Sequence, residues 1–350
     1  MKQKMNMRIW KENVIRNPYK KGAPVLSFPS VQLLGLTVKQ LISTSDSQAN
    51  GMKLIADRCP SLASLSMMDL TLEAQAFGSE VRISDNEVPA TIGSIVQSVE
   101  DAQKLVVPEV GAGRTQIYID AMNKACEMIT DRPVFAGIIG PFTLAGRLIG
   151  ISESMIAVKK QKEMVRITLE KATEFIIKYA KAYKEQTGAN GFVMAEPLAG
   201  VLSPKMNEEF SEPYCKQIID AVQDEEFIVI YHNCGDNVVQ QAPAIKRLGA
   251  EGYHFGNIIK MENILPLMSD NALIMGNIDP SGYFCVGSPE SMNFKVKEVM
   301  EKCCYYPNFV PSSGCDIAPV ANWDCIDEFF KSIDEFYTNK GIPCVDVPCL

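Results

Sequence analysis

The sequence lacks long apolar runs and any excess of basic residues. No stretch of its 350 residues approaches the ~18 consecutive apolar residues that a membrane-spanning helix needs. The opening segment, MKQKMNMRIWKENVIRNPYK, is polar and has no apolar core or small-residue cleavage site, so we expect a cytoplasmic protein. The 34 Lys and Arg against 42 Asp and Glu give a net charge of −8. This acidic balance argues against nucleic-acid binding, and we expect no membrane partner.

Histidine is scarce, with two residues, whereas cysteine is plentiful, with eleven. Hydrophobic residues make up 47% and charged residues 22% of the chain, which is typical of a globular protein and excludes a disordered one. Because a disulfide framework requires an oxidising compartment, most of the cysteines are expected to be buried, reduced thiols. The alternative is that a few of them bind a metal or react, which depends on their neighbours.

Short apolar runs alternate with longer helical patterns along the chain. The runs predicted as strands are 24–31, 61–70, 134–140, 191–197, 227–235, 252–256, 272–279 and 309–317. Several lack a two-residue alternation, which is typical of parallel strands covered on both faces. Strands that alternate with helices predict βαβ units, and eight strands are the number that closes a (β/α)8 TIM barrel.

Helical patterns fill the intervals between these runs, at 152–188, 203–223, 237–249, 289–305 and 322–338. The rival fold is an open, doubly wound sheet, but the segment PSVQLLGLTVKQ after the first predicted strand carries one glycine and no phosphate loop. The region 71–133 is then an N-terminal elaboration of the barrel and a candidate cap over its mouth. Since no linker or internal repeat is visible, residues 1–350 are predicted to form a single domain.

One of the two histidines, His232, precedes Cys234 by two positions in the segment YHNCGDN. Residues two apart in a strand point to the same face, and the apolar run before them places both at the C-terminal mouth of the barrel. Cys315, in PSSGCDIAP, ends the last predicted strand at the same rim. Two thiolates and one imidazole suit zinc and leave a fourth position for water or substrate. The alternative is a core histidine with two inert thiols.

Other polar residues also end predicted strands. Glu196, in GFVMAEP, is a candidate catalytic residue, either as a displaceable fourth zinc ligand or as a hydrogen-bond partner of the substrate. Asp279, in GNIDP, is a second catalytic candidate that would orient the ligating histidine or the substrate. The candidate substrate-binding residues are Asp69, His254 and Asn257. For each of these residues the alternative is an ordinary structural role in a rim, cap or turn.

Five segments carry a family resemblance: GPFTLAGRL (140–148), MAEPLAGVLSP (194–204), YHNCGDN (231–237), GNIDP (276–280) and SSGCDIAP (312–319). In this order they resemble the uroporphyrinogen decarboxylase superfamily, in particular its methylcobamide:coenzyme M methyltransferase branch. The resemblance runs from about residue 8 to residue 340. It implies a (β/α)8 barrel in which His232, Cys234 and Cys315 bind zinc and zinc binds the acceptor thiol. Glu196 departs from the pattern, because many members carry Asp there.

The resemblance implies methyl transfer between a methylcobamide and a small acceptor, first of all a zinc-activated thiol such as coenzyme M. A free thiol is mostly protonated at neutral pH, and zinc deprotonates a coordinating thiol. The methylcobamide would arrive on a separate corrinoid carrier protein, because the chain has no D-x-H-x-x-G corrinoid-binding pattern.

Three alternatives of the same superfamily stay open. The enzyme could demethylate a methoxylated or methylamine donor to load the corrinoid, or transfer the methyl group to tetrahydrofolate. It could also be a zinc-holding scaffold for a corrinoid protein. Uroporphyrinogen decarboxylase itself is disfavoured, because the segment ENVIRNPYKKGAPVLSFP lacks a tight basic cluster and that reaction has no use for zinc ligands.

Overall fold

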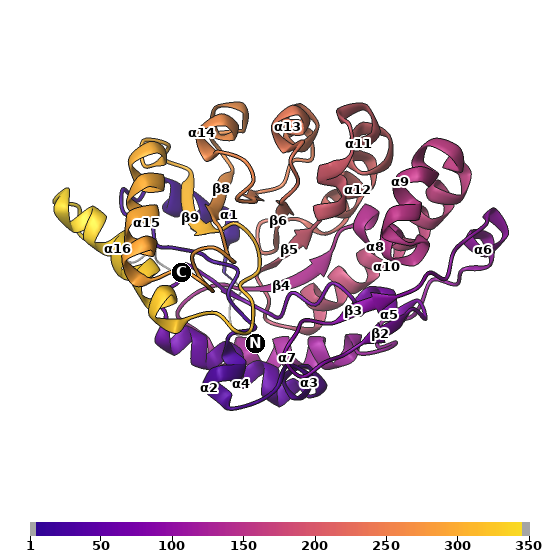
Figure 1. The fold of residues 1–350 in the computed structure, drawn as a ribbon, viewed down its shortest axis with the longest axis horizontal. Helices are drawn as coiled ribbons and strands as arrows, with labels where there is room; N and C mark the ends of the chain where they lie inside the picture. The colour runs from indigo at the N-terminus through magenta and orange to yellow at the C-terminus, as the bar shows by residue number, and fades with distance from the viewer. Residues whose placement is uncertain (1–4, 345–350) are drawn as a thin grey trace.

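A computed structural model describes residues 5–344 of the chain, so the ends of the predicted domain, 1–4 and 345–350, lie outside the described residues. Its centre is a curled parallel sheet with the strand order β1-β4-β5-β6-β7-β8-β9 (Figure 1). The strands are β1 (Ser64–Leu65), β4 (Val134–Ile139), β5 (Gly191–Ala195), β6 (Ile228–Asn233), β7 (Gly252–Phe255), β8 (Leu273–Ile278) and β9 (Phe309–Ser313). A separate antiparallel pair comprises β2 (Glu80–Arg82) and β3 (Ala90–Ile92).

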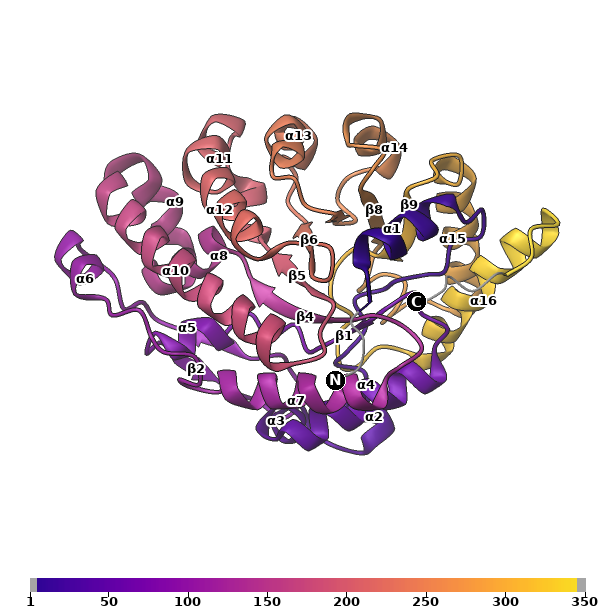
Figure 2. The same ribbon diagram turned by 180° about the vertical axis from the view of Figure 1, so that it is seen from behind.

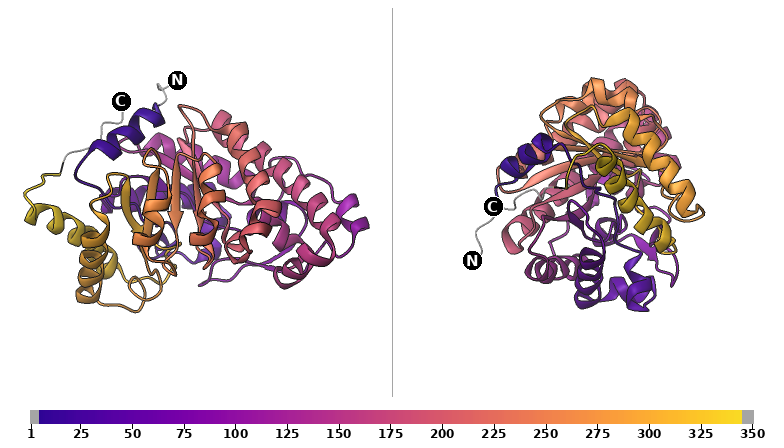
Figure 3. Two further views of the ribbon diagram at one scale, coloured as in Figure 1. Left: turned by 90° about the horizontal axis from the view of Figure 1, so that it is seen from above. Right: turned by 90° about the vertical axis from the view of Figure 1, so that its left-hand side faces the viewer.

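Helices flank the sheet in the two orthogonal views of Figure 3. In the first half of the chain they are α1 (Met7–Arg16), α2 (Ser30–Leu34), α3 (Val38–Ser43), α4 (Ser45–Arg58), α5 (Leu72–Ala76), α6 (Val99–Lys104), α7 (Thr115–Met128), α8 (Pro141–Ile149), α9 (Ile151–Lys160) and α10 (Lys162–Gln186). In the second half they are η1 (Pro197–Val201), α11 (Pro204–Phe210), α12 (Glu212–Val222), α13 (Val238–Arg247), α14 (Met261–Ile264), η2 (Leu265–Leu267), α15 (Pro289–Cys303) and α16 (Trp323–Asn339). None of the helices between residues 5 and 344 is long and apolar enough to cross a membrane.

The first predicted strand, 24–31, is wrong. Pro24 and Pro29 have no backbone N–H to give to a ladder, and α2 begins at Ser30. The extended chain just before it nevertheless bridges the two edge strands of the sheet. The Gly22 carbonyl accepts from the Leu62 N–H (2.8 Å), and the Ala23 N–H donates to the Pro311 carbonyl (2.9 Å). The described ladder therefore has seven strands, and the extended chain at Gly22 and Ala23 lies between its two edge strands, β1 and β9.

The strand predictions from 134–140 onward are confirmed. The predicted strand 61–70 shrinks to the two residues of β1, and two helix predictions also need correction. The run 152–188 is two helices, α9 and α10, separated at Gln161, and nothing in the sequence explains that break. The run 203–223 is also two helices, α11 and α12, separated at Ser211, because Pro213 favours the first turn of a new helix. The region 71–133 contains α5, the β2–β3 pair, α6 and α7. Its role as a cap stays a prediction.

Helix α1 covers the N-terminal ends of the strands (Figure 2). The Met7 N–H donates to the Glu225 carbonyl, just before β6, at 2.6 Å. Lys11 pairs with Glu251, just before β7. The Trp10 ring packs 6.3 Å from the Phe135 ring inside the sheet. The helix therefore plugs one end of the fold, and the carboxyl ends of the strands form the end where a site can open.

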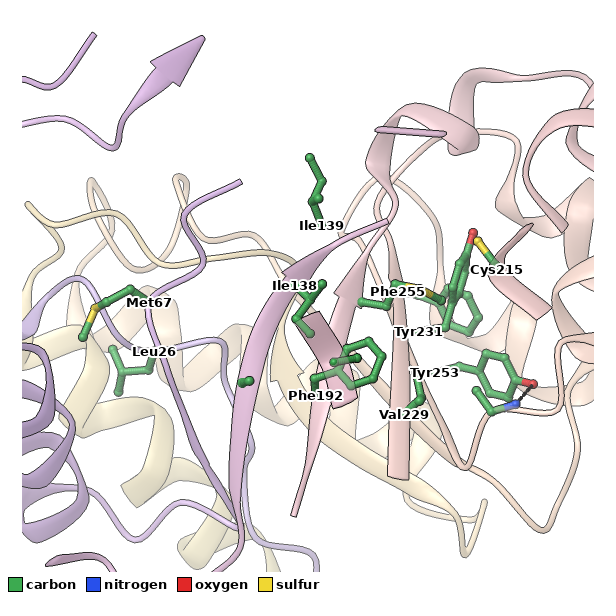
Figure 4. Packing of buried hydrophobic residues seen from close by; sticks show 14 of the residues in the cluster. Leu26, Met67, Ile138, Ile139, Phe192, Cys215, Val229, Tyr231, Tyr253 and Phe255 are labelled. Carbon is green, nitrogen blue, oxygen red and sulfur yellow. Dashed lines mark hydrogen bonds between the residues drawn. The ribbon is translucent and has the colours of Figure 1, made fainter. Parts of the chain in front are cut away.

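Side chains along the strands alternate between two hydrophobic clusters. The cluster inside the curled sheet includes Phe135, Val193, Ala195, Ile228, Ile230, Met275 and Val310. The cluster between the sheet and the helices includes Ile138, Phe192, Val229, Tyr231, Tyr253 and Phe255, with Cys215 of α12 packed beside them (Figure 4). This alternation determines which way each polar residue at a strand end points.

Candidate metal centre

Three of the residues predicted as ligands meet at the carboxyl ends of β6 and β9. One imidazole nitrogen of His232 and the sulfur atoms of Cys234 and Cys315 lie within 4.8 Å of one another. His232 continues the inward-facing positions of Ile228 and Ile230, so its ring points into the sheet. The His232 Nε2 atom lies 3.6 Å from the Cys315 Sγ atom. These three side chains are called the His/Cys/Cys cluster below.

The donor atoms of the His/Cys/Cys cluster fit a zinc ion. Zn–N and Zn–S bonds of about 2.0 and 2.3 Å in a tetrahedron separate a nitrogen and a sulfur ligand by about 3.5 Å. The His232 Nε2 and Cys315 Sγ atoms, 3.6 Å apart, lie close to that separation. The fit depends on two glycines in the flanking loops. A Cβ at Gly256 would lie 2.5 Å from that of Cys234, and a Cβ at Gly314 would lie 2.6 Å from the Asn257 nitrogen.

The two thiols of the cluster have different pKa values. A hydrogen bond between the thiols lowers the pKa of Cys234. The same hydrogen bond, together with burial, raises the pKa of Cys315 to about 12, after a partial offset by His232. Metal binding requires both thiols as thiolates, so it would release protons from the site.

His254, predicted to bind substrate, lies behind the cluster instead. It stands next to His232 in the β6–β7 register, and their Nδ1 atoms are 2.7 Å apart. Its Nε2 atom is 2.8 Å from the Ser312 hydroxyl, which donates to the Ala23 carbonyl at 2.8 Å. Burial, and next the nearby His232, hold the pKa of His254 well below its usual range. Since both ring nitrogens have protein partners, neither is left for a substrate.

Glu196 points away from the cluster. Its position follows Phe192 and Met194 on the outward face of β5, so its side chain reaches the first turn of α8. There Oε1 accepts from the Phe142 N–H at 2.7 Å and Oε2 from the Thr143 N–H at 3.0 Å. Burial raises the pKa of this carboxyl to about 7. The contacts are those of a helix cap, which argues against the predicted ligand role.

Asp69, also predicted to bind substrate, is enclosed in a buried ion pair. Its Oδ2 atom lies 2.5 Å from Arg114 Nη1 and accepts from the Tyr118 hydroxyl at 2.9 Å. Its Oδ1 atom accepts from the Thr71 hydroxyl at 2.6 Å. The side chain of Asp69 has no exposed surface. Sequence reasoning missed Arg114 because nothing near it in the chain marks a partner 45 residues away.

Asn257 and Asp279 line a cavity of about 380 Å³. The close approach of Gly314 to Asn257 places one end of this cavity beside the loop that carries Cys315. Asp279 is turned partly to its own loop, where Oδ1 accepts from the Ser281 N–H at 2.9 Å. The charged residues that also line the cavity are Lys260, Glu262, Lys295, Glu298 and Lys302. Sequence reasoning missed these charged residues, since they belong to no motif.

Comparisons with known proteins agree on one family. A sequence model of the uroporphyrinogen decarboxylase (URO-D) family matches residues 32–336. A methylcobamide:CoM methyltransferase of Methanosarcina acetivorans is 27% identical over 237 residues, which are 67% of this chain and 69% of the relative. A uroporphyrinogen decarboxylase of Hydrogenovibrio crunogenus is 24% identical over 291 residues, or 80% of each chain. The solved structure of a methyltransferase from Methanosarcina mazei shares the fold, with a TM-score of 0.83 at 22% identity over 95% of this chain and 99% of that one.

Proposed function

Because the chain belongs to the uroporphyrinogen decarboxylase family, we propose that it is a zinc-dependent methyltransferase. It moves a methyl group between a methylcorrinoid, carried by a separate protein, and a small thiol acceptor such as coenzyme M. The observation that carries this proposal is the His/Cys/Cys cluster at the carboxyl ends of β6 and β9. A single domain over residues 1–350 and a closed barrel belong to the same proposal. The bonds of Gly22 and Ala23 to both sheet edges support the closed barrel.

In this function, His232, Cys234 and Cys315 hold the zinc ion. Bound zinc supplies a deprotonated acceptor thiol near neutral pH, because coordination lowers the pKa of the thiol. The two cysteine thiolates offset the charge at the site, so the acceptor sulfur keeps its electron density. That sulfur attacks the methyl carbon, an S–C bond forms and the Co–C bond breaks. The electron pair of the broken Co–C bond stays with the corrinoid as cob(I)amide, and the thiol proton leaves to solvent.

The cavity lined by Asn257 and Asp279 would receive the body of the acceptor, because the approach of Gly314 to Asn257 brings one end of it near the loop that carries Cys315. Asn257 and Asp279 follow β7 and β8, and they would orient the acceptor by hydrogen bonds. The cavity carries charges of both signs, because Lys260, Lys295 and Lys302 are matched there by Asp279, Glu262 and Glu298. Its net charge therefore does not select the chemical class of the acceptor.

A second candidate function is uroporphyrinogen decarboxylation. It is favoured by the decarboxylase of Hydrogenovibrio crunogenus, which matches a larger share of this chain than the methyltransferase does. Against it stands the chemistry of the site, because a decarboxylation that uses no metal leaves the three converging ligands without a role.

The test is an anoxic assay of the purified protein with free methylcobalamin and coenzyme M, followed by absorbance. We expect cob(I)alamin to form only when protein, zinc and thiol are all present. The Cys315→Ala variant should be inactive, and Cys304→Ala, a half-buried cysteine outside the cluster, should keep full activity. If activity required a methylated donor or tetrahydrofolate instead of a thiol, the proposed substrate would be wrong but the protein would still be a corrinoid-dependent methyltransferase. Decarboxylation of uroporphyrinogen without methyl transfer would refute the proposal.

A further inference from the structure

The only two histidines of the chain are in direct contact, and one proton lies between them. Their Nδ1 atoms are 2.7 Å apart, with the rings inclined at 61°. Two neutral imidazoles can make this contact in two ways, with the shared proton on either ring. If it is on His232, the Nε2 atom of His232 carries a lone pair. If it is on His254, the Nε2 atom of His232 carries a proton and cannot bind a metal.

Ser312 distinguishes the two arrangements. Its single hydroxyl proton is donated to the Ala23 carbonyl at 2.8 Å, so its oxygen must accept the contact from His254 Nε2. His254 therefore carries its proton on Nε2. The opposite arrangement would turn the Ser312 proton toward His254 and remove the hydrogen bond to the Ala23 carbonyl, and a lost bond at a buried carbonyl is unfavourable.

The surroundings also favour an uncharged His254. His254 is 1% exposed, since its strand β7 pairs with β6 and β8 and its ring contacts Ser312 of β9. The hydrogen bonds of its ring go to His232, to the Ser312 hydroxyl and to the Ser313 backbone, and none of these partners is a carboxylate. A charge at such a position costs free energy without a compensating partner. With its proton on Nε2, a neutral His254 has an Nδ1 lone pair that can only accept from His232.

We propose that His254 and Ser312 are positioning residues that hold His232 in the Nδ1–H form and turn its Nε2 lone pair toward Cys315. The relay runs from the Nδ1–H of His232 to His254 Nδ1, from the Nε2–H of His254 to Ser312, and from Ser312 to the Ala23 carbonyl. Its consequence for zinc rests on the proposed function. Partners that fix the ring of a ligating histidine typically change metal affinity 10- to 100-fold.

The proton arrangement can be read directly by nitrogen-15 NMR of the two histidines. The sample is metal-free, full-length protein, labelled at histidine and made without a histidine tag, so two residues give all the signals. We expect His232 to carry its proton on Nδ1 and His254 on Nε2. A proton on Nε2 of His232 would overturn the proposal. The measurement requires neither zinc nor activity, so its failure is distinct from failure of the proposed function.

Two substitutions at one position test the consequence. In His254→Leu the side chain has a similar size but no acceptor, so zinc affinity, measured by competition with a chelator, should fall 10- to 100-fold. In His254→Asn the amide oxygen can replace Nδ1 as the acceptor, and most of the affinity should return. Equal affinity in wild type and His254→Leu would overturn the relay. Should His254→Leu not fold, Ser312→Ala replaces it, and a loss of the Nδ1–H preference of His232 is expected.

Discussion

At the scale of single residues, the assignment of His232, Cys234 and Cys315 as metal ligands predicts that these side chains differ in function from residues of the same type elsewhere in the chain. Cys315→Ala removes one ligand of the His/Cys/Cys cluster, and elemental analysis should show most of the zinc lost from about one ion per chain. Cys304→Ala is the control, because it removes a thiol at the end of α15 and should leave the zinc content unchanged. Equal zinc in both variants would contradict the ligand assignment.

Asp69 provides a second residue-scale prediction. In Asp69→Asn the Arg114 side chain, which is only 11% exposed, loses its counter-charge. Breaking a buried pair in this way typically costs about 3–5 kcal/mol, which urea denaturation would measure as a lower free energy of unfolding. If stability were unchanged while the KM for the acceptor rose, the ion pair would be less important than the predicted contact with substrate.

The sequence predicted the direction of a side chain wherever the alternation of residues along a strand could be applied. His232 and Cys234 are two positions apart after an apolar run, and they do share one face. The same rule, counted from Phe192 and Met194, would have turned Glu196 outward. The contact of His232 with His254 could not be predicted, because it depends on the register of β6 against β7.

At the scale of elements, the cap of α8 has a measurable pH dependence. The folded protein raises the pKa of Glu196 from 4.5 to about 7, because the carboxyl is buried. The stability contributed by this group is therefore fully present below about pH 4.5 and is lost as the pH rises through about 7. In Glu196→Gln the free energy of unfolding should depend less on pH across this range.

Glu73 belongs in the same experiment, because its pKa is also raised to about 7 by burial. Glu73→Gln should also reduce the dependence of the free energy of unfolding on pH, and the double variant should reduce it more than either single variant. Both single variants should retain zinc. Loss of zinc in Glu196→Gln alone would restore Glu196 as a ligand.

Helix α1 gives a second prediction at this scale. Trp10 is 3% exposed and fills the N-terminal end of the sheet, so Trp10→Ala should destabilise the fold by about 3–5 kcal/mol. The cluster lies at the opposite end of the strands, so the zinc content of the folded variant should not change. If the Trp10→Ala variant kept normal stability but bound no zinc, the separation between a stabilising N-terminal end of the sheet and a metal site at the opposite end would be contradicted.

Elements were predictable from the sequence where local patterns decide them. Six buried runs became β4 to β9, because such runs are typical of parallel strands covered on both faces. The run 24–31 failed because its prolines remove ladder donors, although its apolar pattern resembles a strand. The bridging bonds of Gly22 and Ala23 could not be read from the sequence, since both partners are distant in the chain.

At the scale of the whole molecule, the fold brings together residues that are 83 positions apart, His232 and Cys315. The sequence predicted this meeting, because the carboxyl ends of parallel strands share one edge of a sheet. It did not predict the charged cavity lined by residues of α14 and α15, which depends on how these helices pack outside β8. The metal ligands were therefore more predictable than the surroundings that would select the acceptor.

The zinc ligands can be identified by X-ray absorption at the zinc edge, recorded before and after addition of coenzyme M. We expect two sulfur ligands and one imidazole nitrogen from the protein, and a third sulfur ligand once the thiol is added. Zinc bound without sulfur ligands, or a sulfur count that the thiol leaves unchanged, would contradict the proposed function.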